Sequence, residues 1–227
     1  MALFKIAGLT VEILAGGRTI RQAQPYATDE AGPVDISVTC DPPEVLARNP
    51  ECRTEDHAEY METGTLFAKR LLKFGGFQLH SSAVLLDGKA YLFSAPSGTG
   101  KSTHTEKWCR LFGGKLLNDD KPALRKVDDT WMAYGTPWSG KHDLSVPLGV
   151  PLGAIAYLRR GQENRIRRLT PQEALPCLLS QSLRYLNADQ MTLQLMLLDD
   201  LMKQIPVWEL VCRDDDEAAY LSYENMR

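Results

Sequence analysis

Eight residues near the middle of the chain have the types and spacing needed to hold a phosphate group. The run from Ala95 to Ser102, APSGTGKS, matches the phosphate-binding loop (P-loop) pattern GxxxxGK[ST] except for alanine at the first glycine. Gly98 and Gly100 permit the positive φ angles with which a backbone curls around phosphate. In this pattern Lys101 reaches the β- and γ-phosphates, and the Ser102 hydroxyl binds Mg²⁺. The run therefore predicts a site for a nucleotide polyphosphate.

The segments on either side of this run favour the same prediction. Residues 90–93 are apolar and predict a buried strand that leads into the loop, and residues 103–112 can form a helix that follows it. A helix that begins at the loop directs its free amide groups and the positive end of its dipole at an anion. The alternative is an ordinary Gly-Ser turn, which gives no reason for a lysine followed by two hydroxyl residues.

A pair of carboxylates follows the lysine, one helix and one strand later. Residues 115–117 predict a short strand that ends in Asn118, Asp119 and Asp120. In nucleotide-binding folds this position brings a metal-binding aspartate beside the phosphates. Two adjacent carboxylates repel each other unless a cation joins them. The pair is therefore a candidate metal and catalytic site, and a solvated turn is the alternative.

The strand that enters the P-loop has a predicted partner. Asp87-Gly88 lies between the apolar runs 77–86 and 89–93, and Asp-Gly at such a point is a strong signal for a β-hairpin. The two runs should therefore pair antiparallel, with His80 on the strand beside the one that enters the loop. Taken alone, a single histidine in a strand is usually a structural residue.

The first quarter of the chain carries no motif that assigns it a role. Alternation of apolar and polar residues predicts short strands over residues 3–6, 9–14 and 34–38. Prolines and scattered charges predict a linker or irregular loop over 40–53. We therefore divide the chain into an N-terminal β-rich subdomain with its linker, residues 1–53, and a catalytic domain, residues 54–227.

A helix is predicted after the linker. Asp56 with Glu59 three positions later resembles a capping box, and apolar residues recur at helical spacing up to Gly75-Gly76. Gly64 lies in the middle of this pattern, and glycine in a helix costs about 1 kcal/mol relative to alanine. We therefore expect a break near Gly64.

Beyond the carboxylates, residues 123–134 predict a hairpin and residues 135–142 a loop that contains Trp138. The tryptophan belongs either to a lid over the site or to the core, and the sequence does not decide between them. Arg159 and Arg160 follow a strand over residues 152–158; they either stabilise a transferred phosphate or form a solvated arginine pair. The last part of the chain predicts helices over 171–185 and 188–204, with apolar residues 191–202 in the core, a strand over 206–212 and a terminal helix.

The composition narrows the class of protein. A chain of 227 residues can bury one sizeable core. A net charge of −3 excludes a chain-wide electrostatic case for nucleic acid. No apolar run approaches the ~18 residues of a membrane span, and the N-terminus lacks a secretory pattern. We expect a cytoplasmic protein with neither a nucleic acid nor a membrane as partner, and a homo-oligomer stays an open option.

The order of His80, the loop 95–103 and the pair Asp119-Asp120 resembles the catalytic domain of HPr kinase/phosphorylase and its relative, ATP-dependent phosphoenolpyruvate carboxykinase. The resemblance covers residues 76–160. It is closest to small stand-alone HPr-kinase-like proteins, some of which phosphorylate serine in peptides such as lasso-peptide precursors. It implies an α/β fold: a mixed β-sheet P-loop kinase core, with the N-terminal β-rich subdomain and C-terminal helices.

The resemblance also implies a role for each candidate residue, with ATP and Mg²⁺ as the expected ligands. Asp119 is the expected general base toward the acceptor hydroxyl, and Asp120 and Ser102 are expected at the metal. His80 matches a histidine in the active sites of both relatives, and Lys101 completes the catalytic set. The phosphates are expected on Ser97, Gly98, Thr99, Gly100, Lys101, Ser102 and Thr103.

The phosphoryl acceptor is less well defined. HPr kinases carry a glutamate and a glycine-rich signature after the aspartate pair, and this chain lacks that stretch, so neither phosphorolysis nor HPr as substrate is expected. The carboxykinases are far longer and need further arginine and lysine groups for the small acid and a second metal, so their chemistry is not expected. A serine in a protein or peptide is the leading acceptor. The alternatives are a small-molecule kinase for an amino acid, sugar or nucleoside, and a non-catalytic nucleotide-binding regulatory module.

Overall fold

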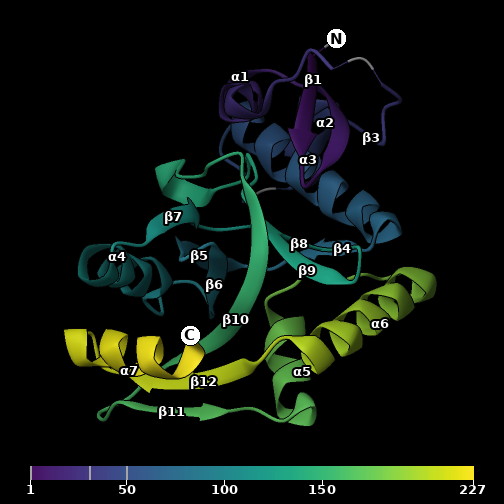
Figure 1. The fold of residues 1–227 in the computed structure, drawn as a ribbon. Coiled ribbons are helices and arrows are strands. Elements are labelled where there is room, and N and C mark those ends of the chain that lie inside the picture. The colour runs from purple at the N-terminus through teal and green to yellow at the C-terminus, as the bar shows by residue number, and fades with distance from the viewer. Residues whose placement is uncertain (1, 31, 50) are drawn as a thin grey trace.

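The computed structural model describes residues 2–30, 32–49 and 51–227, which form a mixed α/β fold (Figure 1). The strands are β1 (Ala2–Ile6), β2 (Leu9–Leu14), β3 (Ile36–Thr39), β4 (Gly76–Gln78), β5 (Ser81–Leu86), β6 (Lys89–Ser94), β7 (Lys115–Asn118), β8 (Ala123–Val127), β9 (Thr130–Tyr134), β10 (Gly149–Arg160), β11 (Arg165–Arg168) and β12 (Val207–Cys212). The α-helices are α1 (Gly17–Ala23), α2 (Pro42–Arg48), α3 (Glu55–Leu71), α4 (Lys101–Phe112), α5 (Pro171–Ser180), α6 (Ala188–Gln204) and α7 (Asp216–Met226).

The larger sheet, nine-stranded over the described residues, is organised around β10. Its main path runs β4-β8-β9-β10-β6-β5-β7, and β12 adds to β10 and carries β11 on its other side. The first residues of β10 pair antiparallel with β9, while its later residues pair parallel with β6 and β12. Figure 1 shows β10 as the long central strand between these two sets. The strand that enters the P-loop, β6, therefore lies directly beside β10.

The predicted hairpin before the P-loop is confirmed, but its first strand is shorter than predicted. Asp87 and Gly88 both have positive φ, 49° and 75°, and β5 pairs antiparallel with β6. The predicted run 77–86 is interrupted after β4, so His80 lies between two strands instead of within one. The interruption is stabilised by tertiary contacts, because the backbone amide of His80 donates to the Gln181 carbonyl (2.8 Å).

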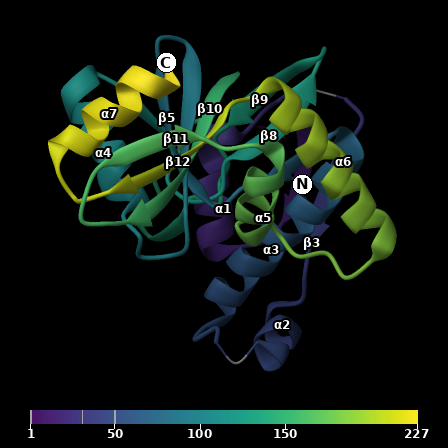
Figure 2. The same cartoon turned by 90° about the horizontal axis from the view of Figure 1, so that it is seen from below.

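The N-terminal region contains the predicted strands and two helices that were not predicted. In the smaller sheet, β1 and β2 are antiparallel, and β3 is parallel to β2. The prediction of an irregular linker over 40–53 was wrong for residues 42–48, which form α2, and position 50 lies outside the described residues. Asp41 caps α2 by accepting from the Glu44 amide, and the prolines occupy its first turn, where no amide donor is needed. Helix α2 lies at the edge of the molecule beside the start of α3 (Figure 2).

Helix α3 differs from its prediction at both the cap and the middle. Its cap is Thr54, which accepts from the His57 amide, while Asp56 accepts from the amide of Arg18 (2.6 Å). The helix continues without a break through Gly64, because glycine is needed there for packing: a Cβ would lie 2.8 Å from Cδ1 of Trp138. Trp138 stacks on Phe67 with ring centroids 4.8 Å apart.

The described residues form three apolar clusters, two of which involve α3 or the C-terminal helices α5 and α6. Tyr60, Phe67 and Leu71 of α3 pack with the strands of the smaller sheet, and Trp138 belongs to the same cluster. The larger cluster lies between the main sheet and helices α5 and α6. Helix α3 thus contacts residues on both sides of position 53, and the predicted division of the chain there stays a prediction.

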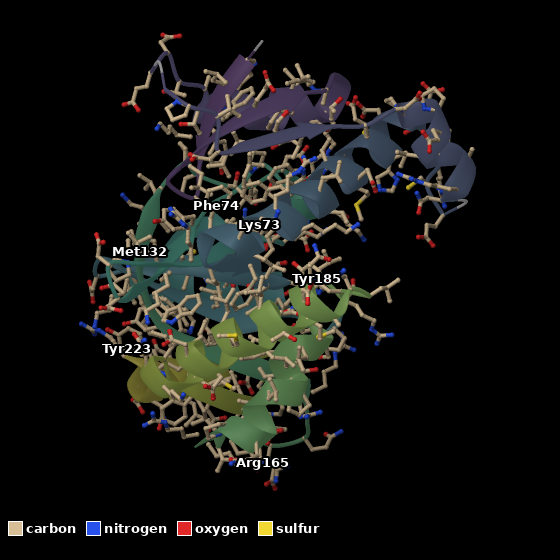
Figure 3. All side chains as sticks on the ribbon, turned by 90° about the vertical axis from the view of Figure 1, so that its right-hand side faces the viewer. Lys73, Phe74, Met132, Arg165, Tyr185 and Tyr223 are labelled. Carbon is tan, nitrogen blue, oxygen red and sulfur yellow. The ribbon has the colours of Figure 1, made fainter. Side chains whose placement is uncertain are left out.

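The C-terminal part follows its prediction with three differences. Helix α5 ends at Ser180, before the predicted end at 185, and α6 has the predicted bounds. Strand β11 was not predicted. The apolar residues of 191–202 are only partly in the core: Leu198 is buried, whereas Met196 is 64% exposed. The α5–α6 connection contacts α3, because the Tyr185 hydroxyl donates to the Ala68 carbonyl. Figure 3 labels Tyr185 at the point where α3 meets the C-terminal helices.

None of the described helices is both long enough and apolar enough to cross a membrane.

Candidate active site

All of the residues predicted for the phosphate, metal and catalytic sites line one cleft of about 1010 Å³. The P-loop and the start of α4 form one wall, and His80, Asp119 and Asp120 line the same cleft. The opposite wall comes from two helices to which the sequence assigned no role at the site, and from the loop that the sequence offered as a lid or as part of the core. It contains Arg18 from α1, three residues of α3 and the 140–142 segment of the loop after β9.

The P-loop has the backbone that its glycines predict. Gly98 has φ +77° and Gly100 has φ +113°, a region that L side chains rarely adopt. Nothing lies within 4 Å of the position that a Cβ would take at either glycine, so the space beside the loop is open. No side chain of the described residues caps the start of α4, whose first-turn amides are therefore unpartnered. These features suit a bound phosphate.

Lys101 is a buried cation held by backbone oxygens. Its Nζ donates to the carbonyls of Ala95 (2.9 Å) and Pro96 (3.3 Å), and the residue is 7% exposed. No carboxylate of the described residues lies within 4.0 Å of Nζ. Burial lowers the pKa of Lys101, and the carboxylates of Asp120 and Asp119 oppose that shift. A bound phosphate would give this ammonium a negatively charged partner.

The aspartate pair is positioned by Asn118, a buried residue to which the sequence assigned no role of its own. Its Oδ1 accepts from the amides of Asp120 (2.9 Å) and Lys121 (2.8 Å), and its Nδ2 donates to the Thr136 carbonyl (3.0 Å). An Asn side chain that accepts from the amides two and three residues later is a common turn device, so Asn118 directly before the pair was the available signal. It fixes the turn that presents both carboxylates.

The two aspartates have different surroundings. Asp119 is 8% exposed, and its Oδ1 accepts from the hydroxyl of Ser82 on β5 (2.9 Å). Asp120 is more open, and its Oδ1 lies 3.3 Å from Nε2 of His80. Asp119 therefore contacts a residue of the main sheet, whereas Asp120 contacts the histidine.

His80 is held in place from three sides. Its Nδ1 lies 3.0 Å from Oε1 of Gln181, which makes Nδ1 the donor, and its backbone oxygen accepts from the Ser94 hydroxyl (2.9 Å). Burial and the nearby Lys101 charge lower the pKa of His80, while Asp120 raises it. A neutral His80 that donates from Nδ1 presents a lone pair on Nε2, and a protonated one donates to Asp120.

The two candidate arginines have different partners. Arg160 reaches the P-loop, where its guanidinium donates to the Gly98 carbonyl. Arg159 instead pairs with Glu209 on β12 (2.7 Å), as does Arg167 from β11. Arg160 is thus the arginine that the fold brings to the cleft.

The loop after β9 forms a fixed part of the opposite wall. Trp138 is 1% exposed, which decides for the core and against a lid. The Tyr60 hydroxyl accepts from the Ser139 amide (2.8 Å). Arg18 stacks on the Tyr60 ring (4.1 Å from guanidinium carbon to centroid), donates to the Gly140 carbonyl and pairs with Asp143. Arg18 and Tyr60 lie far from the motifs in sequence, and no local pattern marks them.

The donor set fits Mg²⁺ with a nucleotide. No three His, Cys, Asp or Glu side chains of the described residues form a metal cluster. Proteins commonly hold Mg²⁺ with one or two carboxylates together with substrate phosphates, so a complete protein cage is not required. The Ser102 hydroxyl and the aspartate pair line the same cleft as the P-loop, which is the arrangement such a site needs.

Comparisons with known proteins give little further information. No protein-family model matches the chain, and no curated protein does. A search of solved structures finds 33 similar chains. One is the HPr(Ser) kinase/phosphatase from Coxiella burnetii, with 11% sequence identity and a TM-score of 0.39 over 65% of this chain and 94% of that chain. A likeness with so low a TM-score carries no argument about function.

Proposed function

We propose that this chain is an ATP-dependent kinase of the HPr-kinase-like type, which transfers the γ-phosphoryl group to a hydroxyl acceptor. The observation that carries the proposal is the composition of the cleft: a P-loop, a buried lysine without a carboxylate partner, two carboxylates and a histidine converge there. Phosphoryl transfer needs positioning and charge stabilisation more than covalent chemistry, so this set is sufficient.

In this mechanism the P-loop amides and Lys101 bind the phosphates, and Lys101 stabilises the charge that develops during transfer. Bound Mg²⁺ would neutralise phosphate charge, and Ser102 and Asp120 are the residues proposed to hold it. Asp119 accepts the proton of the acceptor hydroxyl. The acceptor oxygen then bonds to the γ-phosphorus as the bond to the bridging oxygen breaks, and ADP leaves. Arg160 orders the P-loop through Gly98.

The division of roles between the aspartates is open to a direct test. The resemblance assigns the base to Asp119 and the metal to Asp120. The opposite assignment, with Asp120 as the base and Asp119 at the metal, also needs a test. Asp120 lines both the cleft and a second cavity beside it, whereas Asp119 lines only the cleft. A change at the metal ligand should raise the Mg²⁺ concentration required for half-maximal rate, and a change at the base should lower kcat at saturating Mg²⁺.

A serine in a protein or peptide is the first candidate acceptor, from the resemblance. A small-molecule acceptor is the second candidate, and one observation favours it. The second cavity has a volume of about 380 Å³, toward the lower end of the ~300–1,000 Å³ typical of small-molecule sites. The third reading, a nucleotide-binding regulatory module without turnover, predicts nucleotide binding and no transfer.

The experiment is phosphoryl transfer from γ-labelled ATP with Mg²⁺ to serine peptides and small hydroxyl compounds, compared among wild type, Asp119→Asn and Asp120→Asn. We expect each variant to lose about 100-fold or more of the transfer rate, since general base catalysis and charge stabilisation each contribute at least that factor. Asp128→Asn is the matched control, because Asp128 lies at an exposed hairpin tip. If wild type binds nucleotide but transfers no phosphoryl group, and both variants bind nucleotide equally well, the kinase proposal is wrong and the chain is a nucleotide-binding regulatory module.

A further inference from the structure

The second cavity joins the cleft at the aspartate–histidine pair. Met61, His80 and Asp120 line both, so the two spaces meet where the acceptor hydroxyl has to be. From there the second cavity extends away from the P-loop, between α3 and the start of the α5–α6 connection at 180–183. A molecule in this cavity can therefore present a hydroxyl to the aspartates while the rest of it stays clear of the nucleotide.

Lys121 supplies a cation without a partner in this cavity. It is half-buried, and no carboxylate of the described residues lies within 4.0 Å of its Nζ. Its backbone is held on both sides: the amide donates to Asn118 (2.8 Å), and the carbonyl accepts from the Thr136 hydroxyl (2.7 Å). A half-buried lysine that lines the cavity and follows Asp120 in the sequence favours a carboxylate in the ligand.

The hydroxyl groups that line the cavity favour a positively charged group of the ligand. Thr65 donates its proton to the Met61 carbonyl (3.0 Å), Ser180 to Cys177 (2.7 Å) and Ser182 to Leu178 (2.8 Å). Each hydroxyl thereby uses its one proton on a helix carbonyl and presents only oxygen lone pairs to a ligand, and one lone pair of Ser180 already accepts from Nε2 of Gln181 (3.1 Å). Lone pairs without donors favour an ammonium group.

We propose that the second cavity binds a free hydroxy-amino acid as the phosphoryl acceptor, with its carboxylate on Lys121, its ammonium on the hydroxyl oxygens of 65, 180 and 182, and its hydroxyl toward the aspartate pair. The inference rests on the proposed kinase function and names its substrate class. A serine within a peptide chain offers neither of the two charges, because both are consumed in amide bonds. The transfer yields the O-phospho amino acid and ADP.

Binding is measured first, in the absence of nucleotide, so that the result does not depend on turnover. The probes are L-serine, L-threonine and L-homoserine, with N-acetyl-L-serinamide as the uncharged comparison, observed by saturation-transfer NMR and calorimetry. We expect at least one of the free amino acids to bind and the amide to bind at least about tenfold more weakly, as expected when buried charged groups lose their partners.

Variants of Lys121 then test the contact itself. Lys121→Met removes the charge and keeps much of the stem, and we expect the affinity for the amino acid to fall by about tenfold or more, while Lys121→Arg retains most of it. Lys115→Met is the matched control, because Lys115 is exposed at the start of β7 and lines neither cavity. Thermal stabilisation by ATP should be the same in all four proteins, which also shows that they are folded.

The outcomes separate this inference from the kinase proposal. Transfer to a serine peptide or to N-acetyl-L-serinamide, with no binding of the free amino acids, would overturn the inference and leave the kinase function intact. Equal binding of L-serine to wild type and to Lys121→Met would overturn it as well. Loss of binding in Lys121→Met, together with ATP-dependent formation of the phospho amino acid by wild type, supports both.

Discussion

The two walls of the cleft are built in different ways. The wall formed by the P-loop, which we call the phosphate wall after its proposed role, comes from one continuous stretch, from the end of β6 into α4, and it presents backbone amides and a single lysine. The opposite wall is assembled from α1, α3 and the loop after β9, and it acts through side chains. The functional groups of a continuous stretch can be identified from its sequence motif. The residues of an assembled wall come together only when the whole chain is folded.

The largest expected effect is on the phosphate wall. Lys101→Met removes the buried cation and keeps the apolar stem, so we expect thermal stabilisation by ATP to disappear and the transfer rate to fall by about 1,000-fold or more, as for loss of a principal transition-state charge partner. The melting temperature without nucleotide should change little, because the loss of the hydrogen bonds to the Ala95 and Pro96 carbonyls is offset by removal of a buried ammonium that has no carboxylate partner among the described residues. Differential scanning fluorimetry with and without ATP measures both. Retained stabilisation by ATP would mean that the nucleotide is not held by this wall.

An intermediate effect is expected where the opposite wall packs on the core. Gly64→Val places methyl groups against Trp138, and overpacking of this kind costs about 1–3 kcal/mol. We expect urea unfolding to show that loss, while nucleotide binding by the folded protein persists. Lys69→Val is the control, since it adds the same β-branched side chain at an exposed position of α3. A loss in Gly64→Val no larger than that in Lys69→Val would show that the Trp138 contact does not set the cost, although valine has a higher helix propensity than glycine and a lower one than lysine.

The smallest effect is expected at the edge of the opposite wall. Arg18→Met removes the hydrogen bond to Gly140 and the pairing with Asp143, and partly exposed ion pairs of this kind contribute about 0–1 kcal/mol. We expect faster hydrogen exchange of the amides around 139–143 and little change in overall stability. Arg21→Met, at an exposed position of the same helix, is the control. Unchanged exchange in this loop would show that Tyr60 alone holds it.

The sequence predicted the phosphate wall because its chemistry and its geometry are both local. Positive φ at Gly98 and Gly100, the hairpin turn at Asp87-Gly88 and the carboxylates after β7 all follow from residue types within a few positions of one another. The roles proposed for those residues stay predictions. What the structure adds is that they line one cleft.

The opposite wall could not be predicted because its determinants are tertiary. Gly64 was expected to break α3, and only the presence of Trp138 against it explains why glycine is there. Asp56 was expected to cap its own helix, but it binds the amide of Arg18, and Thr54 takes the cap. The residues that would recognise an acceptor are set by contacts across the fold, so a sequence pattern can identify the reaction more readily than the substrate.

Strand β10 joins parts of the chain that lie far apart in the sequence. The hairpins β5–β6 and β8–β9 join neighbours in the sequence, whereas the parallel pairs β6–β10 and β10–β12 join strands separated by long stretches of chain. Closing such long loops is slow, since their entropy is lost before any contact compensates it. During synthesis, the P-loop and its hairpin therefore emerge before β10 is available to pair with them. A nascent chain carries its phosphate loop for some time before it has a cleft in which to use it.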